Sequence, residues 1–198
     1  INVLGLVFAG MDRFIIPAIA DKAALGTYYA ISFIYITGFT VIGSAVGYVL
    51  YPYLTQGKAI AWKKVTFFLL SVLTALLILL LFGGQFIASL AFKGKYDFAL
   101  QFNIIIPLCF LGILQCAHTI IHFYIYAKSS NKALINYTFY LFIYCIGYYL
   151  SFILLARVID YSISSIIQHI LILWCLKVIM SIIMSFYISQ KKPKLELA

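Results

Sequence analysis

Between Lys64 and Lys93 the chain reads VTFFLLSVLTALLILLLFGGQFIASLAF (residues 65–92), a stretch without a charged side chain. Its centre, from Leu76 to Phe82, is apolar at every position. In hydrocarbon, backbone N–H and C=O groups must be hydrogen-bonded within the protein, which leaves α-helices or a closed β-barrel. Barrel strands are short and alternate apolar with polar residues. The long unbroken run therefore predicts a transmembrane helix.

The rest of the chain has the same character. Of its 198 residues, 65% are hydrophobic and 10% are charged, whereas a soluble domain has about 45–50% apolar and about 25% charged residues. A soluble fold of this length could not hide so much apolar surface from water. The composition excludes a soluble globular domain, a disordered chain and a disulfide scaffold, and it predicts an all-α integral membrane protein.

Short polar segments divide the chain into six apolar runs. We predict transmembrane helices at 1–20, 27–51, 65–92, 98–127, 133–156 and 162–190, forming one six-helix lobe (1–190), and a basic cytoplasmic tail at 191–198. Most of these runs would be roughly 36–45 Å long as helices, more than the ~30 Å hydrocarbon core, so tilt is expected. The second helix should stop at Tyr51, because Pro52 does not continue the hydrogen-bond ladder comfortably.

The basic residues predict the orientation of these helices. One side of the membrane collects Lys58, Lys63, Lys64, Lys128, Lys132, Lys191, Lys192 and Lys194, and the other side Lys22, Lys93, Lys95 and Arg157. The positive-inside rule places the first side, and with it both termini, in the cytoplasm. The net charge of +9 is then partly an orientation signal. No basic face lies outside the membrane, so no nucleic-acid partner is expected, and the loops are too short to hold a catalytic domain.

Charged side chains inside a bilayer are costly, which makes them candidates for function. Asp12 and Arg13 are neighbours that point about 100° apart on a helix, so they cannot both face one partner. They could line a cavity, or form a local ion pair between helices. Lys177 lies near the middle of the last run and shares a helix face with His169 and Leu173. That cationic line could hold an anionic substrate such as a pyrophosphate, or Lys177 could snorkel to an interface.

Two further histidines, His118 and His122, are spaced by one helical turn. This spacing can bind a metal, but the sequence shows no third ligand. We interpret this pair, together with His169, as forming hydrogen bonds between helices, with coupling to protons as the alternative because histidine titrates near neutral pH. No catalytic residue, metal or cofactor is predicted, since no Ser–His–Asp order, Gly-rich phosphate loop or acidic pair is present. This favours a transporter over an enzyme.

Small residues within the apolar runs indicate helix packing. Gly43 and Gly47 have the Gly-x-x-x-Gly spacing that lets two membrane helices approach closely. The four cysteines, Cys109, Cys116, Cys145 and Cys175, have neither metal-binding nor redox spacing. We interpret them as small side chains within the helix bundle.

Five short segments keep an order and spacing across about residues 11–132. They are Met11-Asp12-Arg13-Phe14-Ile15-Ile16, Leu25-Gly26-Thr27-Tyr28, Tyr51-Pro52, Lys95-Tyr96 with Ala99, and Ala127-Lys128 with Asn131-Lys132. Together they resemble helices seven to ten of the Wzx-type O-antigen and capsule repeat-unit flippases, in the multidrug/oligosaccharidyl-lipid/polysaccharide (MOP) exporter superfamily. The last third departs from this pattern, because residues 157–162 lack the glycine that family members often have between the last two helices.

This resemblance implies a MATE/MOP-like transporter of two six-helix lobes, of which this chain is the second. The first lobe would then be a missing N-terminal part of the same chain. It also implies the activity, which is transport of an undecaprenyl-pyrophosphate-linked oligosaccharide across the bacterial plasma membrane. The partners would be this lipid-linked oligosaccharide, the missing lobe and the bilayer. Asp12, Arg13 and Lys177 would be cavity residues, and only the first two stand at motif positions.

Four alternatives remain open. A MATE-like drug/cation antiporter would need buried acidic residues, and Asp12 is the only acid in the middle of a run. A lipid II flippase is a closer relative of the oligosaccharide flippases than this antiporter is. A membrane-embedded polysaccharide polymerase is less expected, because it needs a sizeable outer loop with catalytic residues. The last alternative is a structural subunit without a substrate.

Overall fold

Long α-helices make up the structure, a computed structural model that describes residues 22–93, 102–155 and 162–190. The helices are α3 (Lys22–Thr55), α4 (Trp62–Phe92), α5 (Phe102–Lys128), α6 (Asn131–Leu155) and α7 (Ile163–Gln190), and these ranges contain no strand. All five are long and apolar enough to cross a membrane. The all-α class is therefore confirmed for the described residues, with helices whose length and composition suit a membrane span. The first predicted span, 1–20, and the tail, 191–198, lie outside the described residues.

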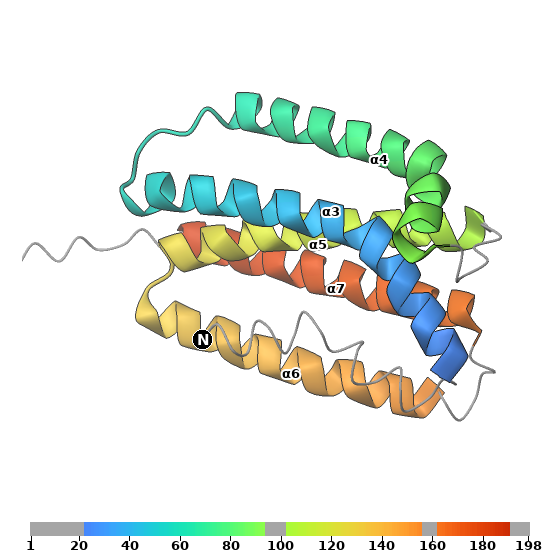
Figure 1. Ribbon diagram of the computed structural model, residues 1–198. Coiled ribbons are helices and arrows are strands. Elements are labelled where there is room, and N and C mark those ends of the chain that lie inside the picture. The colour runs from blue at the N-terminus through green and yellow to red at the C-terminus, as the bar shows by residue number, and fades with distance from the viewer. Residues whose placement is uncertain (1–21, 94–101, 156–161, 191–198) are drawn as a thin grey trace, which may run out of the picture.

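The helix α5 occupies the middle of the bundle. It packs along α3 on one side and α7 on the other, while α4 lies against α3 and α6 against α7 (Figure 1). Phe39 and Leu108, at the contact of α3 with α5, are fully buried. By contrast, Phe82 of α4 is 86% exposed. An apolar side chain on the outside suits a helix bundle whose solvent is lipid.

Glycines set the close contact between α3 and α5. A Cβ atom on Gly43 would lie 2.8 Å from the Cα atom of Cys116, and a Cβ on Gly47 would clash with the ring of Phe123. On the other helix, a Cβ on Gly112 would lie 2.5 Å from the ring of Phe39. The packing role predicted for Gly43 and Gly47 is confirmed.

The end of α3 differs from the prediction. The expected stop at Tyr51 is wrong, because the helix continues through Pro52 to Thr55. Pro52 lies in the last turn, where its C=O still accepts a hydrogen bond from the N–H of Gln56 at 3.1 Å. The helix ends at Thr55, and Gly57, whose φ is +67°, turns the chain away from the helix axis. The N–H of Gly57 bonds to the C=O of Leu54, and the N–H of Lys58 to that of Tyr53, which is a Schellman motif.

Candidate functional site between α5, α6 and α7

Polar side chains lie buried where α5, α6 and α7 meet. Lys177 and Ser181, one turn apart on α7, are 3% and 0% exposed, and His118 of α5 is 8% exposed. Tyr137 of α6 is fully buried beside them, with its hydroxyl next to Ser181. Buried polar groups cost free energy unless they are paired. Their gathering at one place therefore marks the candidate site.

The ammonium group of Lys177 is held against aromatic rings. Its Nζ atom lies 4.0 Å from the ring centroid of Trp174 and 5.8 Å from that of Tyr144. Such cation–π contacts are worth about 2 kcal/mol or more when desolvated. With 3% exposure, the side chain does not reach the surface of the bundle, which argues against the snorkelling interpretation.

No carboxylate in the described ranges pairs with Lys177. The sequence contains five acidic residues, Asp12, Asp21, Asp97, Asp160 and Glu196, and all five lie outside those ranges. Helices α3 to α7 therefore contribute one buried lysine, Lys177, to the bundle interior but no compensating acid. An environment of this kind favours an anion as its ligand.

His118 also belongs to the site, because its ring contacts Trp174. The imidazole of His118 meets the indole edge-on, with ring centroids 5.6 Å apart, and stacks over His122 at 5.9 Å. The Nε2 atom of His118 has no hydrogen-bond partner among the described residues, and neither has the hydroxyl of Tyr140 on α6. Leaving a buried polar group unpaired costs about 1–3 kcal/mol. Both groups are thus free to bind a polar ligand.

The other two histidines connect helices. His122 of α5 lies 3.2 Å from the hydroxyl of Tyr137 on α6, through its Nδ1 atom. His169 of α7 lies 3.0 Å from the hydroxyl of Ser151 on α6, through its Nε2 atom. These contacts correspond to the interhelical hydrogen bonds expected from the sequence. For His118 the structure shows ring contacts with Trp174 and His122.

The helix face predicted for α7 is turned toward α6. His169 contacts Ser151, the C=O of Leu173 accepts a hydrogen bond of 2.9 Å from the hydroxyl of Tyr144, and Lys177 lies over the ring of Tyr144. The shared face of His169, Leu173 and Lys177 thus follows from helical spacing. The two positions of Asp12 and Arg13 lie outside the described residues, so their cavity role stays a prediction.

The aromatic residues around Lys177 are not among the site residues predicted from the sequence. Tyr137, Tyr140, Tyr144 and Tyr148 follow one another at three- and four-residue spacing along α6, and successive rings are 6.0–6.5 Å apart. Trp174 precedes Lys177 by three residues, which is also one helical turn. This periodicity was visible among the many aromatic residues and could have identified the site. No group of three His, Cys, Asp or Glu side chains converges in the described ranges.

Comparisons with known proteins add no family to this picture. No family model, no curated protein and no solved structure matches the chain. The function is therefore inferred from the site and its surroundings.

Proposed function

We propose that this chain is the second lobe of a transporter that moves an undecaprenyl-pyrophosphate-linked oligosaccharide across the bacterial plasma membrane. The observation that carries the proposal is Lys177, a cation buried between apolar helices without a carboxylate in the described ranges. A charge at this depth is costly and is retained where it serves a substrate or ion pathway.

The chemistry of the substrate fits this cation. A pyrophosphate cannot cross hydrocarbon without groups that replace its hydration shell. In the absence of an anion, the rings of Trp174 and Tyr144 hold the ammonium group of Lys177. During transport a phosphate oxygen would take the place of a ring, because a hydrogen bond between two charged groups is the stronger contact. Asp12 and Arg13 would complete the cavity toward the first lobe.

The antiporter alternative is less well supported. A MATE-like drug/cation antiporter needs a buried carboxylate to bind its cationic substrate or coupling ion. The described helices contain no acidic residue, and Lys177 would repel a cation. A lipid II flippase would also carry a pyrophosphate, so the buried Lys177 supports it in the same way.

The test is made in the complete transporter, in cells that depend on it for their surface polysaccharide. We expect Arg13→Ala and Lys177→Ala to lower surface polysaccharide at least tenfold, since about 1.4 kcal/mol of lost interaction is already a factor of ten. Membrane insertion should be unchanged, which is checked by the amount of protein in the membrane fraction. Lys132→Ala, an exposed lysine at the start of α6, is the matched control. Normal polysaccharide in both variants would contradict the cationic cavity.

A further inference from the structure

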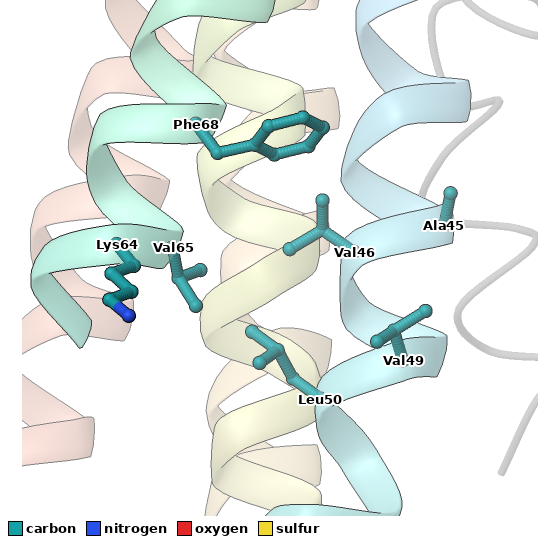
Figure 2. A pocket seen from close by; sticks show the side chains of 7 residues that line it. All are labelled: Ala45, Val46, Val49, Leu50, Lys64, Val65 and Phe68. Carbon is teal, nitrogen blue, oxygen red and sulfur yellow. The ribbon is translucent and has the colours of Figure 1, made fainter. Parts of the chain in front are cut away.

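A groove between α3 and α4 forms a second site, on the opposite side of α3 from the buried cluster. Figure 2 shows the side chains that line it, and its volume is about 420 Å³. Val46, Val49 and Leu50 come from α3, and Val65 and Phe68 come from α4, with Lys64 as the one charged side chain. We propose that this groove binds an acyl chain of an anionic phospholipid, whose phosphate is held by Lys64.

The groove lies along the first half of α4, where residues such as Leu69 and Leu73 pack against the bundle but are only partly buried. The buried residues of α4 are Leu80, Gly84 and Ala88. At Gly84 a Cβ atom would lie 2.5 Å from the hydroxyl oxygen of Tyr35, so the helices approach closely there. Toward the loop that joins them, α3 and α4 diverge (Figure 1). In a bilayer, the apolar space that opens between them is filled by hydrocarbon, because water is excluded from that depth.

The open end of the groove lies at the level of the lipid headgroups. Tyr53, near the end of α3, and Trp62, at the start of α4, are 48% and 45% exposed. Exposed tyrosine and tryptophan side chains gather at the membrane–water interface. The ammonium group of Lys58, in the loop between them, lies 5.9 Å from the ring centroid of Tyr53. An acyl chain in the groove would therefore bring its phosphate to this end.

The charges at this end select an anionic lipid. Lys58, Lys63 and Lys64 are all exposed there, and the described residues offer no carboxylate to neutralise them. Two of these lysines lie in the first turn of α4, where the helix dipole disfavours cations. A phosphate offsets both effects, because it is attracted by lysines and by the N-terminus of a helix. Figure 2 shows the nitrogen of Lys64 turned away from Phe68, toward the end at which α4 begins.

A bound phospholipid explains this site better than a free phosphate does. Apart from Lys64, every side chain that lines the groove is apolar, and a free phosphate would use none of them. The volume of the groove is within the range of about 300–1,000 Å³ found for small-molecule sites. The groove shares no residue with the cluster of Lys177, so the proposal does not depend on the transported substrate.

The experiment uses the full chain in phosphatidylcholine vesicles that contain a minor fraction of photoactivatable phosphatidylglycerol, with the reactive group on the acyl chain. We expect labelling at Val46, Val49 and Phe68, and much less labelling when the same group is carried by phosphatidylcholine. Lys64→Gln should lower phosphatidylglycerol labelling about fivefold, which is the contribution of one lysine near a phosphate. Val46→Trp fills the groove and should remove labelling by both lipids.

Two matched controls should leave the labelling unchanged. Lys132→Gln removes an exposed lysine at the start of α6, and Phe67→Trp enlarges a side chain of α4 that is 75% exposed and does not line the groove. Equal labelling by the two lipids, or no effect of Lys64→Gln, overturns the anionic site. If Val46→Trp has no effect while inorganic phosphate suppresses the labelling, Lys64 binds a free phosphate and the proposal is wrong. Crosslinks from the groove to another protein segment also overturn it.

Discussion

At the scale of residues, Lys177 is retained at a cost in stability. Its ammonium group is buried and has only ring faces as partners in the described structure. A buried ion carries a desolvation penalty of several kcal/mol, which an apolar side chain of similar length does not carry. We therefore expect Lys177→Met to stabilise the chain in detergent by at least about 1 kcal/mol while transport is lost. Denaturant unfolding followed by circular dichroism measures the first effect.

The control for this substitution is Lys132→Met, because an exposed lysine contributes within about 0.5 kcal/mol to stability. A destabilised Lys177→Met variant would show that the contact of Lys177 with Trp174 is structural. The depth of Lys177 could be predicted, since a charge in the middle of an apolar run has few other places to go. Its ring partners could not, because a cation–π contact depends on the rotation of α6 and α7 about their axes.

At the scale of elements, the space around a glycine tells whether it lies where two helices cross or on a helix surface without a close neighbour. A Cβ on Gly43 would lie 2.8 Å from the Cα atom and 3.2 Å from the Sγ atom of Cys116, whereas a Cβ on Gly147 would meet nothing within 4 Å. We expect Gly43→Ala to lower the free energy of unfolding by about 1–3 kcal/mol, the cost of overpacking. Gly147→Ala should raise it by up to about 1 kcal/mol, because alanine favours the helix.

Thermal unfolding in detergent compares the two variants, and equal effects at both positions would contradict the close crossing of α3 and α5. The glycine spacing 43–47 predicted a close contact, but it did not name α5 as the partner. The end of α3 was likewise predictable only in part. The loop was evident from its polar residues, yet the helix runs through Pro52 to Thr55, and Gly57 turns the chain after it. A proline in the last turn loses one hydrogen bond, whereas a glycine with positive φ reverses the chain.

At the scale of the whole molecule, the apolar pattern predicts helices but not their order in space. In a soluble protein a polar face tells which side of a helix is outside. Here both sides of a helix are apolar, as Phe39 at 0% and Phe33 at 64% exposure show on α3. The central position of α5 could therefore not be predicted from the sequence. The ends of the bundle could be, because they depend on loops and charges and not on faces.

The two ends of the bundle carry different numbers of lysines, and this leads to a prediction of orientation. The α3–α4 loop with Lys58 and the α5–α6 connection with Lys128 lie at the same end of the bundle, opposite the end of α4 with Lys93 (Figure 1). The positive-inside rule puts the first end in the cytoplasm. Cysteines at these positions, in a chain whose four native cysteines are replaced, report the orientation through an impermeant maleimide. We expect Lys93→Cys to react in intact cells.

In the same assay, Lys58→Cys and Lys128→Cys should react only after the membrane is opened. The relative result tests the bundle, because both loops must behave alike whichever way the protein is inserted. The absolute result tests the charge rule, which requires the lysine-rich end to face the cytoplasm. If Lys58→Cys and Lys128→Cys differ, the antiparallel order of α3, α4 and α5 is wrong. If all three positions give the reverse pattern, the bundle stands, but the groove lysines would face the outer leaflet and its lipids.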